Sequence, residues 1–282
     1  MSDAFDSVDA LNYFKGRFKN SESLCCESIG VTDVADFEET FWLMNDNTLA
    51  IVALDRLGET TMRDTIKARL SAFQPLGHTA FTNSGWVDPF LHQEVAYLTP
   101  LKTAQCYRWN EASESFGSPL PCAAGMRGIL QEEWNGSMYG DEENYFNLSA
   151  SKALSWHKQF QQSNLISDRW VRDYFITRME LMWNSTNLGF GAPDQAGRMT
   201  TYYLAAYLLA GWKTGWPTPF DPNRRVVVTN TLNSLQQSSN GGFGTWYIVR
   251  NGAVVAVEAN GNMETTSLAV CANIRPQDYF AF

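Results

Sequence analysis

Four segments of the chain begin with polar residues that can cap a helix and continue into small and apolar residues. They cover residues 45–54, 147–154, 200–209 and 264–272. Asn, Asp, Ser and Thr at the start of such a run are typical of a helix N-terminus. The run that follows is apolar on nearly all sides, which indicates a helix buried over most of its surface. We therefore expect these segments to be inner helices.

Three other segments are apolar on one face only. Residues 60–73 have Met62, Ile66, Leu70 and Phe73 at spacings of three and four, and similar stripes run through residues 168–183 and 222–237. Such spacing is typical of amphipathic helices that pack one face inward. We expect these three segments to be outer helices.

The connections between these helices also repeat. Gly-Phe-Gly occurs at residues 189–191 and 242–244, each time between an outer and an inner helix. Residues 246–257 then have Asn251 and Gly252 between two apolar runs, which predicts a short β-hairpin. Residues 74–141 break the pattern with five prolines and scattered glycines. We expect that stretch to form long irregular connections, which in a compact domain are usually functional.

Together these elements predict an all-α fold, an α/α toroid of repeated helix hairpins with a small β-hairpin and long irregular loops. Hydrophobic residues make up 44% of the chain and charged residues 18%, which supplies a large core and excludes disorder. Repeat folds of this length often form one domain, so we expect residues 1–282 to be a single unit.

The segment 235–246 with its Gly-Gly-Phe-Gly turn, followed by residues 264–270, resembles one repeat of the terpenoid-cyclase and protein-prenyltransferase toroids. Residues 183–209 resemble another repeat. Asn45-Asp-Asn-Thr-Leu-Ala also resembles the start of an inner helix in uncharacterised α/α-toroid proteins of archaea and fungi. The resemblance covers about 150 of the 282 residues and implies the fold; it implies no particular activity.

The sequence departs from the chemistry of those families. Squalene-cyclase enzymes use an acidic D-x-D-D motif, and the nearest match here, Asp33-Val-Ala-Asp36, lacks the paired Asp and lies outside an inner-helix start. Protein prenyltransferases bind zinc through Asp, Cys and His, whereas His78, His92 and His157 show no matching arrangement with Cys. We therefore expect no metal and no cofactor.

Net charge and cysteines limit partners and location. A net charge of −9 argues against nucleic acid and anionic membranes as partners. Cys106 and Cys122 flank a stretch rich in Ser, Pro and Gly, where a disulfide and buried free thiols are both possible. The sequons at Asn135, Asn147 and Asn184 favour a secreted protein, although no signal peptide is visible in the chain. We expect a monomer.

Acids near the inner-helix starts are the candidates for catalysis. Asp46, Glu143 and Glu264 have this position, and His92 lies in the irregular stretch. Two carboxylates facing one cleft suffice for the acid/base chemistry of a glycosidase, and a histidine can transfer protons. The alternative interpretation is helix capping, because acids stabilise helix N-termini in any protein.

Aromatic residues make up 13% of the chain, and several lie near the same helix starts. They suit sugar rings, but they also fill gaps between helices. The candidate substrate-binding residues are Asn47, Trp86, Tyr145, Arg198, Tyr202, Trp246 and Tyr247. We expect a carbohydrate-active enzyme, a glycoside hydrolase or polysaccharide lyase, that binds a saccharide or other small molecule. A terpenoid- or prenyl-binding toroid and a non-catalytic binding or structural protein are the alternatives.

Overall fold

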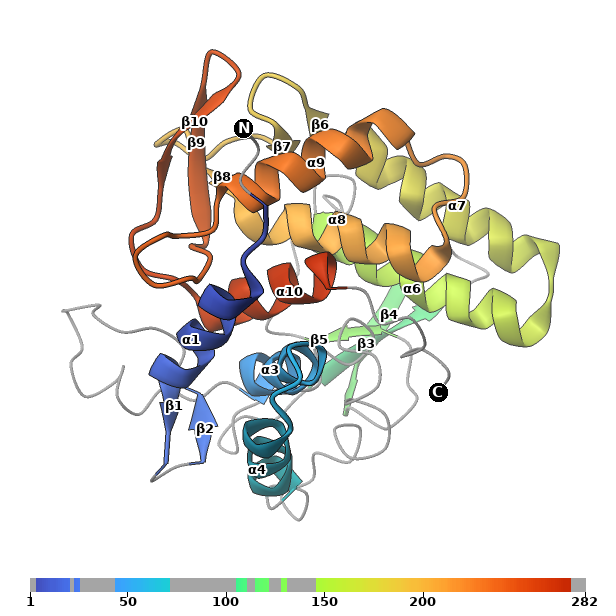
Figure 1. The fold of residues 1–282 in the computed structure, drawn as a ribbon. Helices are drawn as coiled ribbons and strands as arrows, with labels where there is room; N and C mark the ends of the chain where they lie inside the picture. The colour runs from blue at the N-terminus through green and yellow to red at the C-terminus, as the bar shows by residue number, and fades with distance from the viewer. Residues whose placement is uncertain are drawn as a thin grey trace.

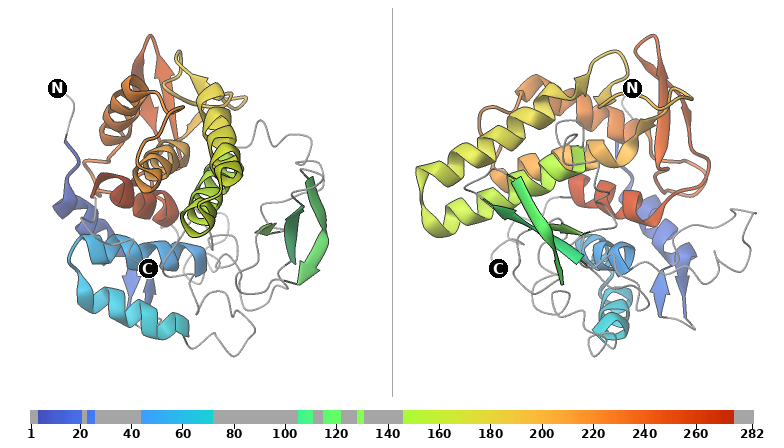
Figure 2. Two further views of the ribbon diagram at one scale, coloured as in Figure 1. Left: turned by 90° about the vertical axis from the view of Figure 1, so that its right-hand side faces the viewer. Right: turned by 180° about the vertical axis from the view of Figure 1, so that it is seen from behind.

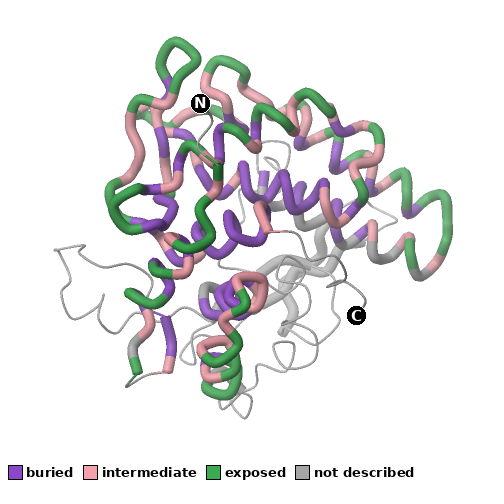
Figure 3. The backbone as a smooth tube through the Cα atoms, viewed as in Figure 1, coloured by how far each residue is buried: buried purple, intermediate pink, exposed green. Residues whose placement is uncertain are grey.

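The computed structural model describes residues 4–20, 23–25, 44–71, 105–110, 115–121, 128–130 and 146–274. All four expected inner helices are present, and they are α3 (Met44–Arg56), α6 (Phe146–Ser163), α8 (Thr201–Thr214) and α10 (Met263–Asn273) (Figure 1). The four form a packed row, since α10 packs against both α3 and α8, and α8 packs against α6. Figure 3 shows buried backbone along most of α8 and α10. The core therefore follows this row.

The expected outer helices are present too. They are α4 (Thr60–Ser71), α7 (Ile166–Leu181) and α9 (Pro222–Ser234). Helix α7 lies antiparallel beside α6 in both views of Figure 2. Asp221 caps α9, because its Oδ1 accepts a hydrogen bond of 2.8 Å from the backbone N–H of Asn223, and Pro222 fills the first turn, where no N–H is needed. Helix α8 ends at Gly215 with a φ of 78°, which is the left-handed cap that glycine favours.

The expected hairpin is present as β9 (Trp246–Arg250) and β10 (Ala253–Val257). Asn251 and Gly252 form its turn with φ angles of 53° and 75°, as a two-residue type I′ turn requires. A third strand, β8 (Met199–Thr200), pairs antiparallel with β9 directly before α8 begins. Two short ladders join β1 (Phe18–Lys19) to β2 (Leu24–Cys25) and β6 (Trp183–Asn184) to β7 (Gly189–Phe190).

The prediction of an all-α toroid is wrong. The chain is rich in α-helix but has small antiparallel sheets as well, and the described residues do not establish a closed ring. Residues 74–141, expected to be irregular, contain the sheet of β3 (Gln105–Asn110), β4 (Ser115–Pro121) and β5 (Gly128–Leu130). The sequence analysis did not predict this sheet, because prolines such as Pro119 and Pro121 argue against a strand. Both prolines lie on β4, an edge strand of the sheet, where proline is tolerated.

A further helix, α1 (Ser7–Arg17), packs against the glycine-rich turn before β9. A Cβ on Gly241 would lie 2.0 Å from the carbonyl oxygen of Asp9, and one on Gly242 would lie 2.4 Å from the ring of Tyr13. Gln236 holds the same helix start, because its side-chain amide donates to the Asp6 carbonyl and accepts from the Asp6 N–H, both at 2.7 Å. The glycines of this turn therefore admit a helix at close range.

Within the described part of the chain, no helix is both long enough and apolar enough to cross a membrane.

Candidate functional site

The central helices run in one general direction, so that their N-terminal ends lie toward the same side. Near the opposite ends, Arg56 of α3 donates to the carbonyl of Cys271 in α10, and Trp212 Nε1 of α8 donates to the Ala272 carbonyl at 3.2 Å. The starts of α6 and α8 meet where the rings of Phe146 and Tyr203 lie 5.0 Å apart. The described starts of these helices therefore lie at one end of the row.

The acids of α3 and α10 lie at similar heights along their helices. Asp46 precedes Arg56 by ten residues, and Glu264 precedes Cys271 by seven. At ~1.5 Å of rise per residue, the two acids are about 15 Å and about 10 Å from the contact between the helix ends. They therefore lie within about one helical turn of the same level. The side chain of Asp46 is outside the described part of the structure.

At the start of α10, the side-chain cap comes from Asn262. Its Oδ1 accepts a hydrogen bond of 2.8 Å from the N–H of Thr265. Glu264 lies in the first turn and is half-buried. The N-cap of α10 is thus Asn262 and not Glu264.

At the start of α3, the Asn47 side chain is fully buried. Its Oδ1 accepts from the backbone N–H of Cys25 at 2.8 Å, and its Nδ2 donates to the Cys25 carbonyl at 3.0 Å. The amide therefore pairs with β2 as a neighbouring strand would. Asn47 ties β2 to α3, which is a structural role that its position at a helix start did not indicate.

Two predicted binding residues, Arg198 and Trp246, come together just before α8. The guanidinium of Arg198 lies 5.2 Å from the centroid of the Trp246 ring, and its Nε donates to Asp194 Oδ2 at 2.9 Å. Hydrogen bonds from the backbone N–H of Arg198 and of Ala196 lower the pKa of Asp194. Asp194, Arg198 and Trp246 form a partly exposed polar and aromatic platform, which we call the Trp246 platform.

Tyr202 and Tyr247 belong to the core instead. Tyr202 is 6% exposed and Tyr247 is fully buried. The hydroxyl of Tyr247 donates to the Leu188 carbonyl at 3.0 Å, and burial raises its pKa.

Four predicted site residues, Trp86, His92, Glu143 and Tyr145, lie outside the described residues, as does Cys122 of the possible disulfide. Cys25 and Cys271 are both buried.

A buried ionic cluster joins α7, α8 and α9, and sequence reasoning missed it. The carboxylate of Glu180 accepts from the Tyr207 hydroxyl at 2.6 Å, from the Asp221 N–H at 3.1 Å and from Arg224. Burial raises the pKa of Glu180, and the hydrogen bond from Tyr207 is the largest opposing effect. Because both oxygens of this carboxylate have donors from the protein, the cluster connects three helices, which is a structural role.

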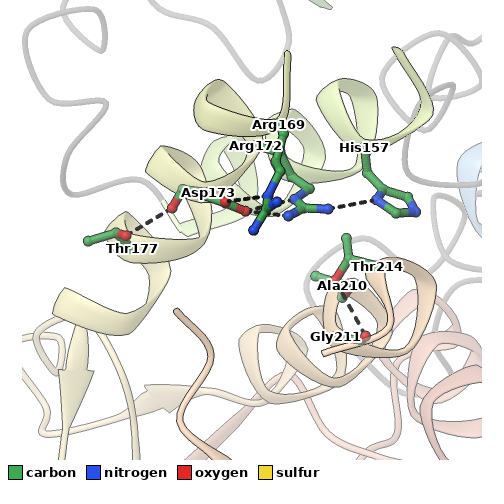
Figure 4. Close-up of polar contacts among 8 residues, drawn as sticks. All are labelled: His157, Arg169, Arg172, Asp173, Thr177, Ala210, Gly211 and Thr214. Atoms are coloured by element: carbon green, nitrogen blue, oxygen red, sulfur yellow. Dashed lines mark hydrogen bonds and ion pairs between the residues drawn. The ribbon is translucent and has the colours of Figure 1, made fainter. Parts of the chain in front are cut away.

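His157 of α6 faces Arg172 of α7 across the helix pair (Figure 4). Its Nδ1 lies 3.4 Å from Arg172 Nη1, and Arg172 also forms an ion pair of 2.6 Å with Asp173. Burial, with the charges of Arg172 and Lys213, lowers the pKa of His157 to about 4. This histidine is therefore neutral near pH 7, and it suits packing between α6 and α7.

Within the described residues, no group of three or more His, Cys, Asp or Glu side chains is arranged to hold a metal ion. Comparisons of the chain with models of protein families, with characterised proteins and with solved structures found no match.

Proposed function

We propose that the chain acts on carbohydrate, as a glycoside hydrolase or a polysaccharide lyase, at the N-terminal end of the central helices. The observation that carries the proposal is the common direction of α3 and α10, since each of these neighbouring helices has an acid in its first turn. Acid/base cleavage of a glycosidic bond needs two carboxyl groups on one cleft. Asp46 and Glu264 are the pair; Glu143 and His92, the other predicted catalytic residues, lie outside the described residues.

The Trp246 platform supports a saccharide as the ligand. An indole face covers the apolar C–H face of a sugar ring, while a guanidinium and a carboxylate can hydrogen-bond its hydroxyl groups. Arg198 and Asp194 hold each other in place beside Trp246. Strand β8 connects this platform directly to the start of α8, which is the end of the row where the two acids lie.

The experiment is an activity assay on a panel of neutral and acidic polysaccharides, with reducing ends for a hydrolase and unsaturated products for a lyase. Asp46→Asn and Glu264→Gln should each lower the rate by ~10²-fold or more, because each removes an acid/base group. Asp9→Asn is the matched control, since Asp9 is a first-turn acid of α1, and it should retain full activity. Full activity in both amide variants, or a wild-type chain that cleaves no member of the panel, would contradict the proposal.

A further inference from the structure

A groove lies at the other end of the central row, between α9 and the ends of α8 and α10. It has a volume of about 260 Å³, and its lining includes Trp212, Arg225, Thr229, Asn230 and Asn273. This is smaller than the ~300–1,000 Å³ of pockets for drug-sized ligands. A ligand for it must therefore be small.

Arg225 is the charged group of the groove, and two indole rings hold it. Its guanidinium carbon lies 4.0 Å from the centroid of the Trp212 ring and 5.0 Å from that of Trp216. The two indoles are themselves in edge contact, with centroids 5.0 Å apart and planes at 89°. Stacking on aromatic faces favours the guanidinium over a lysine ammonium and reduces the conformational freedom that a ligand would otherwise remove.

In the part of the chain that the structure describes, the guanidinium of Arg225 donates to no acceptor and has no carboxylate within ion-pair distance. Its neighbour in sequence differs, because Arg224 is bound to Glu180. A guanidinium presents its N–H groups as a planar fork that matches a carboxylate or phosphate. Within the described residues, the groove thus has a guanidinium that two indole rings hold in place and that has no acceptor of its own.

Three backbone carbonyls near the groove already accept hydrogen bonds from side chains, so a cation would compete with these donors. The Ala272 carbonyl accepts from Trp212, the Cys271 carbonyl from Arg56, and the Ala269 carbonyl from the side chain of Asn273. The C-terminus of a helix nevertheless keeps a partial negative charge, and the whole chain has a net charge of −9. Both disfavour a phosphate dianion, whose two charges lie on one group, more than a carboxylate group, which has one charge shared over two oxygens.

We propose that this groove binds a small carboxylate ligand, with Arg225 as its bidentate partner and the side chains of Thr229 and Asn230 at its edge. The site lies away from the helix starts discussed above, and it does not depend on the proposed enzymatic activity.

The test follows the indole N–H signal of Trp212 by nuclear magnetic resonance during titration with succinate. The signal is assigned by its loss in Trp212→Phe, and succinamide serves as an uncharged probe of similar shape. Succinate should shift the signal with a dissociation constant on the order of 1 mM, as suits one ion pair with a small ligand. Succinamide should bind at least about tenfold more weakly, since it lacks the charge-assisted hydrogen bonds.

Variants assign the effect to the guanidinium. Arg225→Gln should weaken succinate binding at least about tenfold, and Arg225→Lys should weaken it about fivefold, because the charge remains without the planar fork. Arg250→Gln is the matched control, an exposed arginine on the β9–β10 hairpin, and should leave binding unchanged. Equal binding of succinate and succinamide, tighter binding of inorganic phosphate, or unchanged affinity in both Arg225 variants would each overturn the proposal.

Discussion

Tyr207→Phe removes one hydroxyl group from the buried cluster at Glu180 and little else. The hydroxyl donates to Glu180 Oε1 at 2.6 Å, and the side chain is fully buried. The phenyl ring should keep its contacts with Phe190 and Phe220, whose centroids lie 4.8 Å and 5.3 Å away. The substitution therefore isolates the hydrogen bond rather than the packing of the ring.

The expected loss of stability follows from the charge of the acceptor. A hydrogen bond to an ionised group contributes ~1.5–3 kcal/mol. Glu180 retains donors from Asp221 and Arg224, so its carboxylate is not left without partners. The expected decrease in the free energy of unfolding at pH 7 is therefore about 2 kcal/mol, near the lower end of that range.

Urea denaturation followed by circular dichroism measures this decrease as a lower midpoint with an unchanged slope. Tyr174→Phe is the matched control, because Tyr174 is 52% exposed and its hydroxyl accepts from Arg178 at the surface. It should change stability by less than about 0.5 kcal/mol. If Tyr207→Phe also stays within about 0.5 kcal/mol of the wild type, the hydrogen bond from Tyr207 to Glu180 does not stabilise the packing of the helices.

Two further substitutions test the packing of α1 and the titration of His157. Gly242→Ala should destabilise the chain by roughly 1–3 kcal/mol, because the added methyl group overpacks against the ring of Tyr13. Gly16→Ala is the control and should be neutral or stabilising, since no atom lies near the position of its Cβ. Equal melting temperatures for both variants would contradict the close packing of Gly242 against α1. Because the folded pKa of His157 is about 4, below its ordinary value of 6.5, the unfolded chain binds the proton first, and stability should fall as the pH drops from about 6.5 toward about 4. His157→Gln should flatten the dependence of unfolding free energy on pH in that window, and an unchanged slope would show that other groups cause it.

The helices could be predicted because burial leaves a pattern of apolar residues in the sequence, either a stripe on one face or a continuous apolar run after a polar cap. Helix α8 is the clearest case, since nearly every residue from Thr201 to Gly211 is buried and the segment is apolar throughout. Helix α1 could also have been predicted from the sequence. Its buried residues, Ala10, Tyr13, Phe14 and Arg17, follow one another at helical spacing, and Asp6 caps the helix.

The site was less predictable, because which polar group contacts which depends on packing between distant elements. Glu180, Tyr207 and Arg224 come from three different helices, and no local spacing links them. Asn47 has the sequence position of a ligand-binding residue, but its partner, Cys25, lies on β2. Conversely, adjacent Arg224 and Arg225 look equivalent in the sequence, and only the structure shows that one is bound to a carboxylate while the other lies on two indoles.

Near the C-terminal end of α10, the protein offers a ligand hydrogen-bond donors rather than acceptors. At the C-terminal end, Trp212 and Arg56 donate to the carbonyls of Ala272 and Cys271, so side chains occupy two of the carbonyls that a helix end leaves open. A cation or an amide would have to displace one of these donors. An anion would displace nothing, because the fork of Arg225 has no acceptor in the described part of the chain. Binding of succinate without loss of the Trp212 contact to Ala272 is therefore the expected result, and exchange protection of the Trp212 indole N–H should stay the same in the presence of the ligand.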